Sequence, residues 1–112
     1  MPWARLDDGF WSHPKTMRLA DVAPEAGFLH IRAISYSTRH MTDGFLADSA
    51  LTALMPDPEE RAKATEVLVE EGVWYRDGDK GYVIHDFLDW NPSRAQIMEK
   101  RLRDRERKAQ NA

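Results

Sequence analysis

Cysteine is absent from this sequence, so the chain can form neither disulfide bonds nor thiolate-bound metal sites. Long apolar runs are absent as well, because no segment approaches the roughly 18 apolar residues that a membrane-spanning helix needs. The N-terminal segment turns acidic at Asp7 and Asp8 and carries no apolar stretch of the signal-peptide kind. We therefore expect a cytoplasmic protein that does not bind membranes.

Sequence signatures of catalysis are also missing. The chain has no glycine-rich phosphate loop and no serine nucleophile motif, and its histidines lack the four-residue spacing of a helical metal site. His85 and Asp86 are adjacent, but neighbouring side chains on a strand point to opposite faces. We therefore expect no catalytic residue, no metal and no cofactor, and we interpret the histidines as caps, surface residues or hydrogen-bonding groups.

Charged residues are abundant but unevenly distributed. The 112 residues carry a net charge of −3. Residues 92–112 contain seven basic and three acidic side chains, a net charge of +4, so residues 1–91 carry −7. An acidic body with a basic tail bears on binding partners rather than on the fold. The length and the hydrophobic content of 42% suit one globular domain.

Apolar periodicity and turn residues predict five helices and three short strands. The helices are expected at residues 12–20, 24–40, 48–55 and 58–71 and from Pro92 to about Lys108, and the strands at 45–46, 73–76 and 82–85. Asp57 and Pro58 form a typical helix start, and Gly72 is well placed to end that helix in a left-handed conformation. Segment 77–81 tolerates positive φ and predicts a hairpin loop.

The order of these elements is typical of a winged helix. Three helices, at 24–40, 48–55 and 58–71, precede the two-stranded hairpin, and a stub of strand follows the first of them. We therefore predict a mainly α fold with a small β-hairpin. It comprises a winged-helix (helix-turn-helix) domain with an N-terminal extension over 1–91 and an additional basic C-terminal helix over 92–112. The alternative is a generic small α+β domain with a hairpin at one edge.

Four local segments, which together span nearly the whole chain, carry a resemblance to a known family. They lie at residues 6–15, 41–46, 69–74 and 81–94 and read LDDGFWSHPK, MTDGFL, VEEGVW and GYVIHDFLDWNPSR. They resemble phage-borne winged-helix proteins, including the N-terminal domains of replisome organisers and DnaD-like replication initiators. The resemblance implies a winged-helix fold and a role in the replication or transcriptional control of a phage or mobile element. These segments are mostly structural, so they bear on the fold more than on the activity.

The expected third helix, residues 58–71, is the usual DNA-reading element of a winged helix. It carries two basic and five acidic residues, and such a charge repels phosphates. Its candidate DNA contacts are Arg61, Lys63 and Thr65, and helical spacing places Thr65 on the face opposite the core. The alternative interpretation is a solvated, capped helix with acidic residues favoured in its first turn.

The expected wing offers Arg76 and Lys80 as phosphate contacts, although an ordinary hydrophilic turn would look the same. Aromatic residues could serve as platforms for base stacking. We interpret Trp74 and Trp90 instead as packing residues, since each lies next to a predicted helix.

The last helix has the densest basic charge. Its candidate DNA contacts are Arg94, Lys100, Arg101, Arg103, Arg105, Arg107 and Lys108. Ile97, Met98 and Leu102 form a short apolar stripe that is expected to anchor the first half of the helix, so that the rest projects. The alternative is a solvated helix held by internal acid–base pairs such as Glu99 with Arg103.

The sequence therefore predicts a DNA-binding winged-helix protein, with double-stranded DNA favoured, in replication initiation or transcriptional regulation. The alternative is a protein-interaction module that does not bind DNA directly. Such a module would form a homodimer or dock to a replication or regulatory protein. It is motivated by the acidic third helix, whose outer face includes Ala62 and Val69 among carboxylates.

Overall fold

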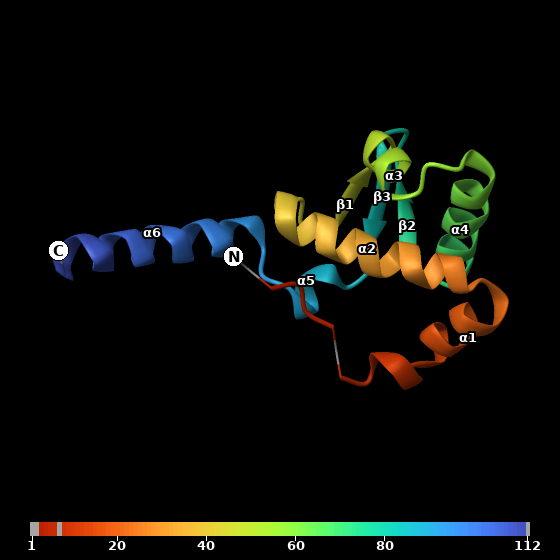
Figure 1. The fold of residues 1–112 in the computed structure, drawn as a ribbon, viewed down its shortest axis with the longest axis horizontal. Coiled ribbons are helices and arrows are strands. Elements are labelled where there is room, and N and C mark those ends of the chain that lie inside the picture. The colour runs from red at the N-terminus through yellow and green to blue at the C-terminus, as the bar shows by residue number, and fades with distance from the viewer. Residues whose placement is uncertain (1–2, 7, 112) are drawn as a thin grey trace.

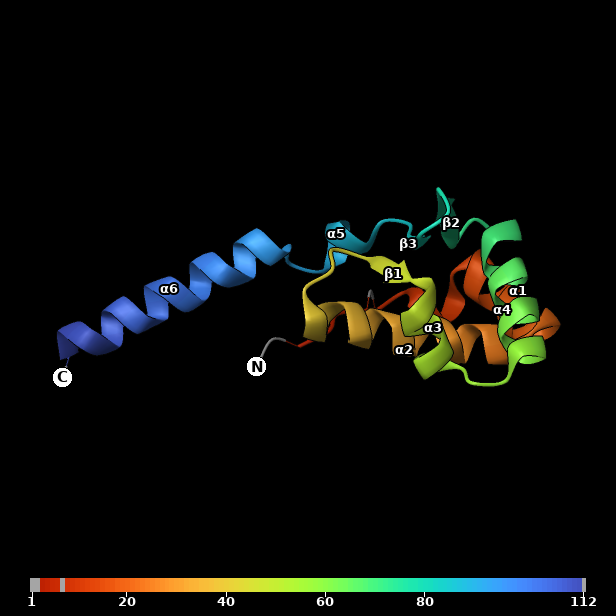
Figure 2. The same ribbon diagram turned by 90° about the horizontal axis from the view of Figure 1, so that it is seen from above.

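The computed structural model describes residues 3–6 and 8–111. In chain order its elements are η1 (Phe10–Ser12), α1 (Pro14–Val22), α2 (Pro24–His40), β1 (Phe45–Ala47), α3 (Asp48–Leu54), α4 (Pro58–Glu70), β2 (Trp74–Asp77), β3 (Gly81–Ile84), α5 (Phe87–Trp90) and α6 (Arg94–Asn111). Figures 1 and 2 show that η1 to α5 form one packed unit, here named the body, while α6 extends away from it as an arm.

The three strands form one antiparallel sheet in the order β1-β3-β2, so the predicted strand stub joins the predicted hairpin. Leu46 of β1 and Arg76 of β2 both lie opposite Tyr82 of β3. Gly81 allows β1 to approach closely, because a Cβ atom there would lie 2.1 Å from the Leu46 carbonyl oxygen. The sequence suggested a turn role for Gly81, and the structure gives it a packing role.

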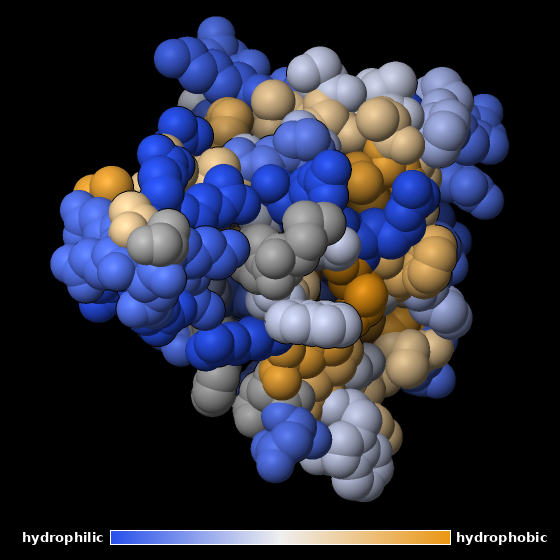
Figure 3. All heavy atoms as spheres, turned by 60° about the vertical axis from the view of Figure 1, so that its left-hand side comes forward, coloured by the Kyte–Doolittle hydropathy of each residue, from blue (hydrophilic) through white to orange (hydrophobic). Residues whose placement is uncertain are grey.

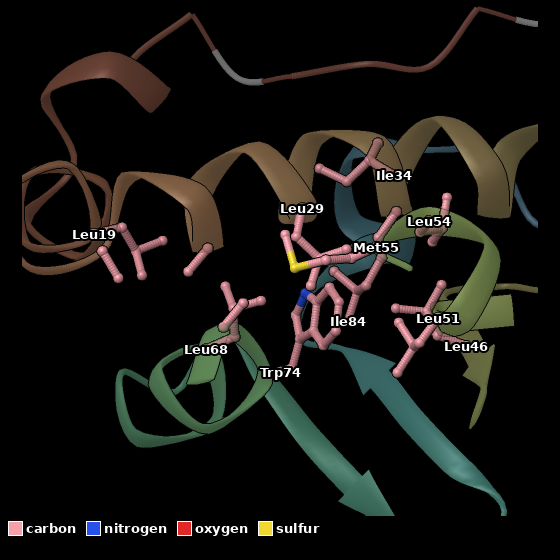
Figure 4. Packing of buried hydrophobic residues seen from close by; sticks show 14 of the residues in the cluster. Leu19, Leu29, Ile34, Leu46, Leu51, Leu54, Met55, Leu68, Trp74 and Ile84 are labelled. Carbon is pink, nitrogen blue, oxygen red and sulfur yellow. The ribbon is translucent and has the colours of Figure 1, made fainter. Parts of the chain in front are cut away.

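The core lies between α2 and one face of the sheet. Leu29 of α2, Leu46 of β1, Leu68 of α4 and Trp74 of β2 are each at most 1% exposed, and Figure 4 shows their side chains pointing into one cluster. Burying each such side chain contributes about 1.5–3 kcal/mol. Since α1, α3 and α4 also contact α2, one central helix ties the body together.

A hydrogen bond inside the core joins α2 to β2. The Trp74 indole Nε1 donates to Nδ1 of His30 at 3.0 Å, and His30 is only 6% exposed. Burial lowers the pKa of His30 to about 4, so the ring is neutral near pH 7 and can accept this bond. The predicted packing role of Trp74 is confirmed, whereas the side chain of Trp90 lies outside the described part of the structure.

Local signals at the helix ends agree with most of the predictions. Asp57 caps α4, since its Oδ1 accepts hydrogen bonds from the backbone N–H groups of Glu59 and Glu60 at 2.9 and 3.3 Å. Gly72 has the left-handed φ of 72° predicted for it. The helix expected from residue 12 begins at Pro14 instead, because His13 is its N-cap and the His13 Nδ1 accepts from the Lys15 N–H.

The short helix α5 was not predicted, because four residues are too few to show a helical period. It follows Asp86, which has a φ of 61°. Asn91, at its end, is 5% exposed and binds the N-terminal segment, since its Oδ1 accepts from the Arg5 N–H at 2.7 Å. This bond holds residues 3–6 against the end of the body from which α6 leaves.

The predicted mainly helical fold with a small antiparallel sheet is confirmed at this level. Among the described residues, no helix is long and apolar enough to cross a membrane. The arm begins at Arg94, close to the predicted boundary at residue 92.

Candidate nucleic-acid interface

The arm begins at a fixed point because its first turn is capped. Ser93 Oγ accepts a hydrogen bond from the Gln96 N–H at 3.1 Å, while Gln96 Oε1 accepts from the Ser93 N–H at 2.8 Å. This reciprocal pair is a capping box. Asp43 adds a third acceptor, with its Oδ1 2.6 Å from the Arg94 nitrogen. These bonds satisfy N–H groups that have no partner inside the helix.

Beyond this first turn the arm has little contact with the body. Ile97 is buried, but Met98 and Leu102 are 47% and 51% exposed. The expected anchoring stripe is therefore reduced to its first residue. The predicted projection of the rest is observed, and it begins earlier than the sequence suggested (Figures 1 and 2).

All seven candidate cations of the arm are exposed to solvent. Arg103 lies 3.9 Å from Glu99, the internal pair foreseen in the sequence, and Arg107 lies 2.8 Å from Asp104. Five cations have no ion-pair partner within residues 3–6 and 8–111, namely Arg94, Lys100, Arg101, Arg105 and Lys108. Figure 3, which brings this end of the molecule forward, shows a mostly hydrophilic surface over the arm.

The hairpin presents its two candidates differently. Arg76 is held by Asp48 at the start of α3, through bonds of 2.8 and 3.1 Å, and its guanidinium carbon lies 4.8 Å from the centre of the Tyr82 ring. The hydrogen bond from Arg76 lowers the pKa of Asp48, and the same bond raises the pKa of Arg76. The positive charge of Arg76 is thus paired with the carboxylate of Asp48 within the body, while Lys80 at the loop is exposed.

The two cations of α4 also have partners inside the body. Nη1 of Arg61 donates to the carbonyl oxygens of Met55 and Pro56 at 2.9 and 3.0 Å, so this side chain closes the turn between α3 and α4. Lys63 lies 3.9 Å from Glu25 of α2 and remains exposed. Arg61 therefore has a structural role that the sequence did not indicate, whereas Lys63 has only an exposed ion pair.

The structure contradicts the predicted exposure of Thr65. It is 7% exposed, and its hydroxyl donates to the carbonyl oxygens of Arg61 and Ala62 at 2.9 and 3.1 Å. The prediction assumed a single buried face around Ala64 and Leu68, but α4 contacts α2, α3 and β2 together and therefore buries a wider arc. A buried hydroxyl with both bonds inside α4 is not available to DNA, so the prediction of Thr65 as a DNA contact is wrong.

The candidate cations do not form one continuous face. Both views in Figures 1 and 2 place α4 and α6 at opposite ends of α2. The outer side of α4 is acidic, with Glu59, Glu66 and Glu70 exposed. In the described chain, most of the candidate cations therefore lie on the arm.

The sequence also predicted that His85 and Asp86 point apart and that the chain holds no metal site. Nδ1 of His85 lies 2.9 Å from Asp86, although strand alternation was expected to separate them. Strand β3 ends at Ile84 and Asp86 is left-handed, so the alternation does not reach this pair. In the described parts of the chain, no group of three or more potential ligands is placed to hold a metal ion.

A shallow groove on the body was not foreseen. It has a volume of about 300 Å³ and lies between η1, α1 and α2. Leu19, Gly27, Phe28 and Ile31 are among its lining residues, and Phe28 is 64% exposed. The sequence signal for this groove is Gly27 beside Phe28 on α2. A glycine inside a helix has no side chain and leaves space next to its large neighbour.

No family model matches the chain, and neither the curated proteins nor the solved structures contain a match to it. The resemblance to replisome organisers and DnaD-like initiators therefore stays a prediction.

Proposed function

We propose that the protein binds double-stranded DNA and that the α6 arm supplies most of the phosphate contacts. The observation that carries this proposal is the contrast in how the cationic side chains are held. Of the nine body cations, three pair with carboxylates and three donate to backbone carbonyl oxygens, namely Arg18, Lys63 and Arg76, and Lys15, Arg32 and Arg61. Five of the seven arm cations have neither kind of side-chain partner in the described chain. Unpaired, exposed cations on a projecting helix release counterions from DNA at little cost.

The body supports a winged-helix interpretation. The order α2, β1, α3, α4, β2, β3, with β3 between the other two strands, is the arrangement expected of such a domain. In this interpretation α4 is the groove-reading helix, but its outer carboxylates would repel phosphates. We therefore assign affinity to the arm, with Lys80 at the wing as an additional contact, and little base recognition to α4.

The resemblance of four sequence segments to phage-borne winged-helix proteins supports a role in replication initiation or transcriptional regulation of a phage or mobile element. Sequence-independent phosphate binding suits either role, because both require the protein to remain on DNA before it meets its target.

Fluorescence anisotropy with a labelled random-sequence duplex, at about 50 mM and about 200 mM salt, tests the proposal. Replacing Lys100 and Arg101 by Gln should weaken binding and reduce the salt slope by about 0.9 for each lost phosphate contact. The matched control is Lys15→Gln with Arg18→Gln, which removes the same charge from body positions bonded to Gly72 and Glu71 and should bind like the wild type. Equal losses in the two variants, or no binding at low salt, would contradict the proposal.

A second candidate function is a protein-interaction module without direct DNA binding. It is favoured by the outer face of α4, where Val69 is 38% exposed beside Glu66 and Glu70. Light scattering with and without duplex separates the two. A stable dimer or complex that is indifferent to DNA would favour this second function, and a monomer that binds duplex tightly would exclude it.

A further inference from the structure

The arm exposes a seam that is apolar at four of its five positions and has the spacing of a coiled coil. Steps of three and four residues relate its members, which are Ala95, Met98, Leu102, Arg105 and Ala109. Such spacing keeps side chains on one side of a helix over several turns. All five are exposed, and Met98 and Leu102 are about half exposed. Within the described structure, nothing in the body covers this seam.

The contact between arm and body uses a different side of α6. Ile97 is the buried residue of the arm, and at 100° per residue it lies about 120° from the middle of the seam. Docking to the body therefore leaves the seam accessible. Figures 1 and 2 show open space around most of the arm, so a second helix can lie along it.

The residues that flank the seam are segregated by sign. Arg94, Arg101 and Lys108 recur every seven residues on one side, and Glu99 and Glu106 recur every seven residues on the other. In heptad terms the basic residues occupy the g positions and the acidic residues the e positions.

This segregation selects one partner and one orientation. In a parallel pair of identical helices, a g residue faces the e residue five positions further along the partner. Arg94 then faces Glu99 of the second copy, and Arg101 faces Glu106 of the second copy, twice over by symmetry. An antiparallel pair would bring g against g and e against e, which places like charges together.

We propose that α6 is a dimerisation helix that pairs in parallel, and in register, with α6 of a second copy of this chain. Existing ion pairs offer little competition, because the 3.9 Å contact of Glu99 with Arg103 is exposed and weak. Arg105 is the one charged member of the seam, and two copies would bring its guanidinium groups together. The pairing is therefore reversible, and Arg105 is the residue that limits it.

Cysteine cross-linking tests the register directly, because the chain has no cysteine of its own. Arg105→Cys places a thiol in the seam, within disulfide reach of its counterpart in a parallel pair. Arg103→Cys is the matched control, since it removes the same charge two residues away on an outward position. Under mild oxidation, full-length Arg105→Cys should form a covalent dimer while Arg103→Cys stays monomeric. Equal cross-linking of the two, or none in either, would overturn the proposal.

Charge exchange tests the orientation. Glu99→Arg with Glu106→Arg should abolish cross-linking of Arg105→Cys, and so should Arg94→Glu with Arg101→Glu. Mixing these two variants should restore it as a heterodimer, because each g residue again faces an e residue of opposite sign. Cross-linking that survives in either variant alone would refute the pairing. These measurements contain no DNA, so a failure of DNA binding leaves their outcome unchanged.

Discussion

The body and the arm differ in their net charge and in whether their cationic side chains have partners. The body carries a net −7 over residues 1–91, and it holds its cations with carboxylates and carbonyl oxygens, as Arg76 does with Asp48. The arm carries a net +4 over residues 92–112 and leaves most of its cations without a partner in the described chain. Most cations of the body therefore take part in its own ion pairs and hydrogen bonds, whereas most cations of the arm remain exposed to solvent.

The side chains that stabilise the fold are also divided unequally between the body and the arm. The largest buried side chains belong to the body, whereas Ile97 is the buried residue of the arm. Mutations that lower the free energy of unfolding should therefore lie in the body, and mutations that lower affinity should lie in the arm.

The strongest test of this division is a pair of truncations. Trp74→Ala should lower the free energy of unfolding by about 3–5 kcal/mol, because it opens a cavity and removes the donor to buried His30. Leu102→Ala on the exposed arm should change it by less than about 0.5 kcal/mol. Denaturant unfolding followed by circular dichroism measures both. A loss above about 1 kcal/mol in Leu102→Ala that does not change on dilution would show that the arm packs on the body, since a loss of dimer pairing depends on protein concentration.

The second test uses pH. Burial depresses the pKa of His30 from 6.5 to about 4, so the unfolded chain binds a proton at this site more readily than the folded chain. The stabilising effect is complete above about pH 6.5 and is lost as the pH falls toward 4, by about 3 kcal/mol in all.

Unfolding midpoints measured between about pH 7.5 and about pH 4.5 should reveal this loss. In His30→Gln, whose side-chain oxygen can still accept from Trp74, the decline over that range should be much smaller. A decline of the same size in both proteins would assign the effect to other groups.

Local signals explain how much of the fold could be predicted from the sequence. Asp57 before Pro58, and Gly72 after α4, act through their own backbone and need no tertiary context. Thr65 was misplaced because its burial depends on how many neighbours α4 contacts, which a single helical face cannot reveal. The position of each element was therefore easier to predict than the width of its buried arc.

The candidate site shows the same limit. Its cations could be counted in the sequence, but their partners could not, because Arg76 meets Asp48 from 28 residues away and Lys63 meets Glu25 from another helix. The arm was the exception, since its ion pairs are three and four residues apart on one helix. The ion pairs of a site on one projecting helix are therefore easier to predict from the sequence than those of a site assembled from several elements.

The smallest expected effect concerns helix propensity in the two regions. Gly27 lies inside α2, and a Cβ atom there would meet nothing within 4 Å. Gly27→Ala should therefore raise the free energy of unfolding of the body by about 0.5–1 kcal/mol.

The mirror change on the arm is Ala109→Gly, at an exposed position near the end of α6. It carries the same intrinsic penalty, but that penalty should appear as lost helical signal from the arm, while the unfolding midpoint of the body stays unchanged. Circular dichroism gives the first quantity and denaturant unfolding the second. If Ala109→Gly shifted the midpoint as much as Gly27→Ala does, arm and body would unfold as one cooperative unit. The independence that the exposed arm implies would then be wrong.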